Sequence, residues 1–508
     1  MGCSATDHNS ETKDGETNRP LANFSPDIWG DRFLTLSFHP SELESCSRQV
    51  EVLKETVKDM LIASTADPIH NIFLINTLCR LGVSHHFESE IHKQLTLRFD
   101  TLCQLTDNND YELHTITVIF QVFRFHGYNM SSDVFNKFKH GNGEFKVSDT
   151  KGMISLYEAT QFRTNGELVL DDAFAFTTSK LTSMKSQLSS PHYAEYIVNA
   201  LNHPYHKSMP RLEARKYICF YEKEDDARNE TLLKFAKYDF NRIQMILQQE
   251  LSNLCRWWKE ENMESRFPCI RHRLVENFFV AVGFYFEPRF ARARSIDVKL
   301  LSILGLIDDT YDAYGTYEEL QCFTDAIQRF DISAMDQLPT DHLKLVYECV
   351  LKVLDEVEKQ VRKEGRSYAV SYIRNETKEV AVTYLTERRW AHERYLPTVD
   401  EYLEAALKPS KDEEKRGVVC GTNCYVKQYG GTRQEAVEAF KEMIEAAWKD
   451  MNEACLDPIM PVSNPTVMRV INCARLLENV YEDNNGFSMP ELSLKHHIAN
   501  LLLHPLPL

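Results

Sequence analysis

Three aspartates with a spacing suited to metal binding stand out in the sequence. Asp308 and Asp309 are adjacent, and Asp312 follows after two residues, which gives the pattern DDxxD. On a helix, Asp308 and Asp312 lie one turn apart on one face, so their oxygens can share divalent ions. Mg2+ takes hard oxygen ligands and is commonly completed by phosphate oxygens of a substrate. The motif therefore predicts a site for Mg2+, or alternatively Mn2+, and a diphosphate; a solvated acidic turn is the competing interpretation.

The residues that precede the aspartates must position them. Leucines and isoleucines between Lys299 and Asp308 cover every side of a helix, so we expect this helix to be buried all round. Ionised carboxylates at the end of such a core are costly unless a cation or strong donors compensate them. This context favours the metal site over the solvated turn. The sequence has no GxxxxGK[ST] string, which argues against a P-loop nucleotide enzyme.

The rest of the sequence predicts an all-α protein. Apolar residues recur at three- and four-residue spacing, for example at 343–361, and signals for β-sheet are almost absent. A chain of 508 residues is too long for one compact core. We therefore expect two helical domains, at 1–225 and 226–508, divided within a charged segment.

Composition argues against several classes of function. The formal net charge is −17 and basic residues do not cluster, so we expect no nucleic-acid partner. No apolar run reaches 18 residues and the first residues are polar, so we expect a cytoplasmic protein without a membrane span. We also expect a monomer. The thirteen cysteines have neither metal-binding nor disulfide spacing. Gly2 begins a string that fits the N-myristoylation template, with a flexible tail as the alternative.

Longer motifs resemble the class I terpene synthases of plants. The string LIDDTYDAYGTYEEL is similar to the first metal motif of that family, and similar strings cover nearly the whole chain. They include Arg19-Pro20 followed by Trp29-Gly30, GYNMSSDVFNKFK (127–139), KGMISLYEAT (151–160), ETLLKFAKYDFNRIQ (230–244), Arg271-x-Arg273, GFYFEPRFARAR (283–294) and PTVDEYL (397–403). The Arg19-Pro20 pair resembles the cytosolic sesquiterpene branch rather than plastid monoterpene enzymes.

The resemblance implies both a fold and a reaction. The fold is an N-terminal α-barrel-like domain with a C-terminal class I terpenoid synthase α-bundle. In the family, aspartates that match Asp308, Asp309 and Asp312 hold Mg2+, with Asp308 and Asp312 expected as direct ligands. The metal binds farnesyl diphosphate, and ionisation of this substrate starts a carbocation cyclisation. Geranyl diphosphate is an alternative substrate. Arg271 and Arg273 are implied to lie over the diphosphate, and an ordinary surface pair is the alternative.

One block of the family pattern is absent. After PTVDEYLEAAL the family continues through roughly forty residues, about two or three helices, whereas here Lys415-Arg416-Gly417 follows almost at once. The block normally supplies an active-site wall, a diphosphate-facing arginine and most of a second metal motif, (N/D)DxxSxxxE. Alignment on Lys415 leaves Glu413 as the last metal ligand and Ala405 at the first. A one-residue shift substitutes Glu414 and Ala406, and a solvated charged loop is the alternative for both glutamates.

Two functional hypotheses remain open from the sequence. The first is an active, magnesium-dependent sesquiterpene synthase. The second is a catalytically impaired family member, a splice or gene-model variant, whose role is restricted to association. A chain-lengthening prenyltransferase is disfavoured, because such enzymes carry two aspartate-rich motifs and lack this N-terminal half.

Overall fold

The computed structural model describes residues 24–36, 39–108, 111–141, 143–147, 149–184, 191–224, 228–406, 420–457, 464–481 and 486–508. Within these ranges the regular structure is helical, and the one extended pairing is an isolated bridge between Lys139 and Phe145. The predicted all-α class is therefore confirmed. No helix in this part of the chain combines the length and apolar character that a membrane crossing needs.

The chain divides into two compact units, each built from several stretches of sequence. Unit 1 consists of Met1–Asp27, Asn262–His272 and Lys299–Gly430. Unit 2 consists of Ile28–Glu261, Arg273–Val298 and Gly431–Leu508. The predicted domain boundary between residues 225 and 226 falls outside the described residues, and that division stays a prediction.

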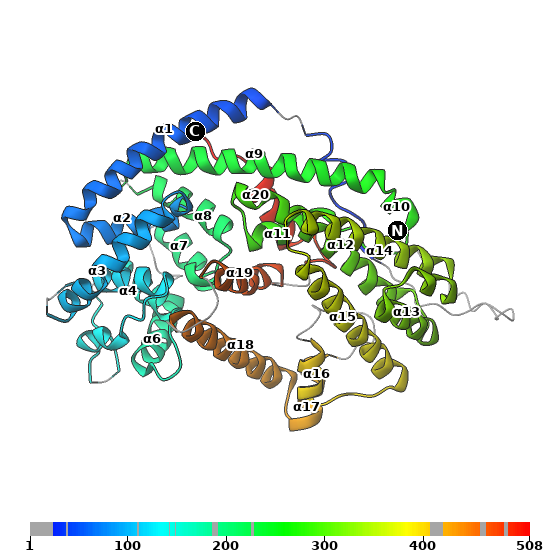
Figure 1. Cartoon of the computed structure of the whole chain (residues 1–508). Coiled ribbons are helices and arrows are strands. Elements are labelled where there is room, and N and C mark those ends of the chain that lie inside the picture. Colours follow the sequence, from blue (N-terminus) through cyan, green and yellow to red (C-terminus); the bar gives the residue numbers. More distant parts are fainter. Residues whose placement is uncertain are drawn as a thin grey trace, which may run out of the picture. The chain divides into compact units, whose positions relative to one another are not determined.

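Unit 1 carries the helix that ends in the three aspartates. Its helices are α10 (Met263–Arg266), the second part of α12 (Ala291–Ala313), α13 (Tyr317–Arg329), η6 (Ile332–Gln337), α14 (Asp341–Lys363), α15 (Tyr368–Glu393), α16 (Val399–Ala406) and α17 (Gly421–Tyr429). Helices α13, α14 and α15 pack against one another (Figure 1). The spacing of apolar residues along α14 explains this packing, because its valines, together with Leu343 and Leu354, fall on one buried face.

A tight turn follows the aspartates and begins α13. A Cβ at Gly315 would lie 2.5 Å from Cδ2 of the buried Leu320, so any larger residue here would displace that side chain from the core. Thr316 then caps α13: its Oγ1 accepts from the backbone N–H of Glu319, and the Glu319 carboxylate accepts from the Thr316 N–H. The string DAYGTYEE thus ends one helix and starts the next within four residues.

Unit 2 contains the following helices: α1 (Pro40–Ala63), η1 (Ser64–Ala66), α2 (Pro68–Arg80), η2 (Ser84–His86), α3 (Glu88–Asn108), α4 (Leu113–Phe125), η3 (Ser132–Phe138), α5 (Thr150–Thr160), α6 (Leu168–Met184), α7 (Pro191–Asn202), η4 (Tyr205–Lys207), α8 (Pro210–Glu222), α9 (Glu230–Glu260), α11 (Leu274–Phe284), η5 (Pro288–Phe290), the first part of α12, α18 (Arg433–Leu456), α19 (Asn464–Val480) and α20 (Ser493–Leu502).

The longest helix of unit 2 is α9, along which α1 packs (Figure 1). Asn229 starts α9, because its side chain accepts hydrogen bonds from the N–H groups of Thr231 and Leu232. Leu247, Leu251 and Leu254 recur at helical spacing and are buried, so one face of α9 belongs to the core.

Candidate functional site

The three aspartates occupy the last turns of α12, in unit 1. Every residue of this helix from 299 to 313 is buried or half-buried, as predicted from its apolar sequence. The side chain of Asp308 is 19% exposed, whereas that of Asp309 is 1% exposed. Adjacent residues of a helix point about 100° apart. Asp309 is therefore turned away from Asp308 toward the buried side of the helix, in keeping with its lower exposure.

Arg271 holds the buried aspartate. The backbone N–H of Arg271 donates to Oδ2 of Asp309 at 2.6 Å, and its Nε donates to Oδ1 at 2.7 Å. The same guanidinium reaches Asp308, with Nη2 2.6 Å from Oδ2. Such charge-assisted contacts compensate a carboxylate that water does not reach. Both oxygens of Asp309 are thereby bonded to Arg271, whereas Asp308 contacts Arg271 through one oxygen and is the more exposed of the two.

The surroundings of Arg271 keep it charged. Burial acts to lower its pKa, but the negative charges of Asp309 and Asp308 outweigh burial and raise the pKa above its ordinary value. The guanidinium carbon lies 4.8 Å from the ring centroid of Phe24, which adds a cation–π contact. Nothing in the sequence pattern around Phe24 indicated this contact, because it joins residues more than 240 positions apart.

The other predicted site residues have different outcomes. Arg273 belongs to unit 2, where it is 4% exposed and its Nε donates to the carbonyl oxygen of Phe487 at 2.6 Å. Glu413 lies outside the described residues, as does Glu414, so the last ligand of the second metal motif stays a prediction. Ala405, at the position of the first ligand, is buried in α16.

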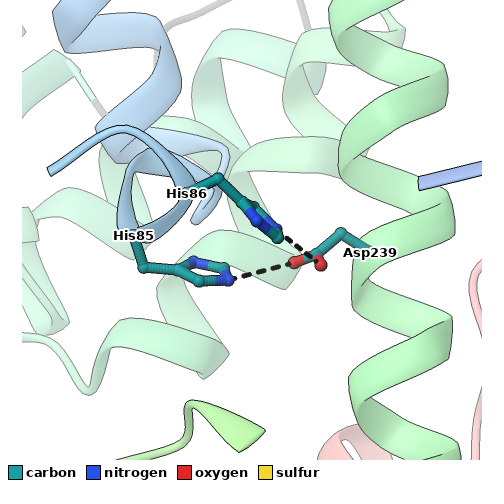
Figure 2. A group of neighbouring side chains, drawn as sticks. All are labelled: His85, His86 and Asp239. Atoms are coloured by element: carbon teal, nitrogen blue, oxygen red, sulfur yellow. Dashed lines mark hydrogen bonds and ion pairs between the residues drawn. The ribbon is translucent and has the colours of Figure 1, made fainter. Parts of the chain in front are cut away.

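A second group of side chains has the composition of a metal site. His85 and His86 of η2 and Asp239 of α9 offer ligand atoms that all lie within 4.8 Å of one another, and both imidazoles point at the carboxylate (Figure 2). His86 Nε2 is 2.9 Å from Asp239 Oδ1. His85 Nε2 is 3.8 Å from Oδ2. Burial lowers the pKa of His85 to about 3, so this imidazole is neutral. No local sequence pattern indicates this cluster, because His86 and Asp239 are 153 residues apart.

Two arginines argue against a metal ion in this cluster. Arg242 Nη2 is 2.9 Å from Asp239 Oδ1, and Arg211 Nη1 is 4.0 Å from Oδ2. A zinc ion about 2.1 Å from a carboxylate oxygen would lie within roughly 5 Å of the Arg242 guanidinium. At an effective dielectric constant of about 20, the repulsion between these charges is roughly 7 kcal/mol. The cluster is better explained as a buried carboxylate that is neutralised by its neighbours and joins η2, α8 and α9.

Family models match most of the chain. Residues 28–201 match the model described as "Terpene synthase, N-terminal domain". Residues 259–410 and 406–450 match the model described as "Terpene synthase family, metal binding domain". The second match consists of two pieces that meet where the sequence predicts an absent block.

Full-length relatives and a solved structure agree with these matches. The chain is 41% identical to a probable terpene synthase 6 of Ricinus communis over 552 aligned positions, covering 96% of this chain and 99% of the relative. It is 40% identical to valerianol synthase TPS8 of Camellia sinensis, with 97% and 98% covered. Isoprene synthase of grey poplar, solved with three Mg2+ ions and dimethylallyl-S-thiolodiphosphate, matches with a TM-score of 0.83 and 27% identity over 92% of this chain and 98% of that one.

The alignment with the Ricinus communis relative is longer than the 508 residues of this chain. The relative therefore contains residues that have no counterpart here. Together with the two-piece match to the metal-binding domain, this supports the absence of a block between residues 407 and 415.

The different surroundings of the adjacent aspartates predict different effects on stability. Asp309→Asn places an amide NH2 against the donors of Arg271, so we expect the free energy of unfolding to fall by about 3 kcal/mol. Asp308→Asn, at a partly solvated side chain, should cost no more than about 1 kcal/mol. Chemical denaturation followed by circular dichroism measures both values. Equal losses for the two variants would contradict the separate roles of these residues.

The cluster around Asp239 predicts a structural rather than a metal-dependent role. Asp239→Asn leaves buried positive charges uncompensated, and we expect it to lower the free energy of unfolding by about 3–5 kcal/mol. Asp172→Asn is the control: its carboxylate pairs with Lys139 but is 49% exposed, so its loss should stay below about 1 kcal/mol. Added Zn2+ should not raise the melting temperature of the wild-type chain. A rise with Zn2+ that Asp239→Asn abolishes would reverse the assignment.

Proposed function

Since the chain belongs to the plant terpene synthase family, we propose that it ionises a prenyl diphosphate with the help of Mg2+ bound at Asp308 and Asp312. The proposed substrate is farnesyl diphosphate and the proposed product a cyclic sesquiterpene. A relative named valerianol synthase and the resemblance of the first residues to the sesquiterpene branch support this choice. Geranyl diphosphate and a shorter prenyl diphosphate are the alternative substrates.

One observation carries the proposal: Asp309 turns to Arg271, which leaves Asp308 and Asp312 one turn apart on a single face of α12. Carboxylate oxygens in this arrangement suit Mg2+, which takes few protein ligands and completes its shell with water and phosphate oxygens. When bound there, Mg2+ would neutralise charge that develops on the departing diphosphate. Asp309 contributes by holding the Arg271 backbone and side chain at the edge of the site.

In the proposed reaction, Arg271 changes its contact with Asp308 and keeps its contacts with Asp309. Its Nη2 contacts Asp308 Oδ2 at 2.6 Å, where a bound cation would repel it. Its Nε and backbone contacts with Asp309 need not change. We infer that Nη2 leaves Asp308 as the metal binds and donates to a diphosphate oxygen, because a guanidinium presents several fixed donors. Arg273 is proposed as a second donor to the diphosphate, in keeping with the family resemblance.

A second candidate function is binding of the magnesium diphosphate without turnover. The two-piece match to the metal-binding domain and the buried Ala405 at the first position of the second metal motif favour it. Glu413 alone would then remain of that motif. Without this block, water would also enter the pocket, and water quenches carbocations.

Product analysis tests the proposed reaction. The purified chain is incubated with farnesyl diphosphate and Mg2+, and volatile products and released diphosphate are measured. Wild-type protein should form a hydrocarbon or alcohol product. Asp308→Ala and Asp312→Ala should each lower the rate by about 100-fold or more, since loss of metal ligation removes several kcal/mol of charge stabilisation.

Asp336→Ala is the matched control, because Asp336 is an exposed carboxylate of unit 1 outside the aspartate cluster. This variant should keep the wild-type rate. Folded wild-type protein that binds magnesium diphosphate but forms no product with any prenyl diphosphate would support the second candidate. Products that survive both Asp308→Ala and Asp312→Ala would sink the assignment of the site.

The proposal also includes a monomer that acts in the cytoplasm, as expected from composition. A single species of about 59 kDa in light scattering after gel filtration, and a diffuse cytoplasmic signal from a fluorescent fusion in plant cells, are the expected results. A dimer mass or a plastid signal would correct this part.

A further inference from the structure

Helix α15 brings a second set of polar side chains to the aspartates. Tyr384 and Arg388 lie one turn apart on α15, as Asp308 and Asp312 do on α12. The Tyr384 hydroxyl is hydrogen-bonded to Asp308, and its ring centroid lies 5.6 Å from that of Tyr311. Burial, followed by the charge of Asp308, raises the pKa of Tyr384, so the hydroxyl keeps its proton and donates to the carboxylate. This contact fixes which face of α15 is turned toward the aspartates.

Arg388 follows Tyr384 on that face and has one buried donor without a partner in the part of the chain that the structure describes. Its Nε is fully buried and has no hydrogen-bond partner among the described residues. Burial lowers the pKa of Arg388, and the negative charge of the nearby Asp312 opposes this shift only in part. A buried charged donor without an acceptor costs free energy. An arginine placed in this way is therefore suited to a ligand that brings acceptors of its own.

The neighbouring Arg389 is an ordinary surface arginine of the same helix and serves as a comparison for the burial of Arg388. Its side chain is exposed, whereas that of Arg388 is half-buried. Lysine or arginine side chains on a solvated helix face normally extend into water. Arg388 instead keeps its Nε out of water beside the aspartate site, although this site offers it no hydrogen bond in the described part of the chain.

The chemistry of the site points to a diphosphate as the missing acceptor. Arg271 is already engaged with Asp308 and Asp309. The planar guanidinium of Arg388 presents several donors that match phosphate oxygens. We propose that Arg388 binds the diphosphate at the Asp308 and Asp312 site, where it supplies positive charge in place of the arginine expected in the absent block. This inference rests on the proposed function, since it needs a diphosphate at that site.

Calorimetric titration with inorganic pyrophosphate in saturating Mg2+ tests the inference on the full-length chain, without a need for turnover. Arg388→Gln keeps most of the side-chain volume and removes the charge, so the Kd for pyrophosphate should rise about tenfold or more. Arg389→Gln removes the same charge one residue away and should leave the Kd within about twofold. Raising the KCl concentration should weaken wild-type binding more than binding by Arg388→Gln.

The outcomes separate this inference from the proposed function. If wild-type protein binds magnesium pyrophosphate and Arg388→Gln binds it equally well, or Arg389→Gln loses as much, Arg388 has no role in binding. If the folded wild-type chain does not bind it at all, the proposed function fails first. If Arg388→Gln unfolds, Arg388→Lys decides, because lysine keeps the charge but lacks Nε. Its Kd must exceed the wild-type value, and equal affinity would overturn the inference.

Discussion

Three carboxylates at the end of a buried helix carry negative charge that the surrounding structure must compensate. Water reaches Asp308 in part and Asp309 hardly at all. Arg271 compensates the charge of Asp309 by donating hydrogen bonds from its backbone N–H and its Nε. Phe24 packs on the same guanidinium. The position of Arg271 is therefore tied to that of α12. Because protein donors compensate the most buried carboxylate, we propose the other two aspartates, which are more exposed, as the metal ligands.

The separate roles of the aspartates determine what the absent block would change at this site. A site with a complete second metal motif would distribute the charge of a diphosphate over ligands on both of its sides. The sequence contains the first motif, whereas the family resemblance predicts that only Glu413 or Glu414, outside the described residues, remains of the second. Guanidinium groups beside the first motif then become more important, because they can offset anionic charge without a metal. Arg271 and Arg388 of unit 1 lie beside the aspartates.

The sequence predicted much of this site but not its internal contacts. The helical spacing of the aspartates and the apolar run before them predicted the buried helix that the structure shows. Contacts of Phe24, Tyr384 and Arg388 depend on how distant helices pack, and no local pattern encodes that packing. The cluster of His85, His86 and Asp239 was missed for the same reason.

A crystal structure of the chain with Mn2+ and an unreactive prenyl diphosphate analogue tests the central claim most directly, because the anomalous signal of Mn2+ locates the metal. We expect anomalous peaks within coordination distance of oxygens of Asp308 and Asp312, with Asp309 still bound to Arg271 and with Nη2 of Arg271 moved to the diphosphate. A peak coordinated by Asp309 with Arg271 displaced, or a peak at His85 and Asp239 with none at α12, would contradict the assignment.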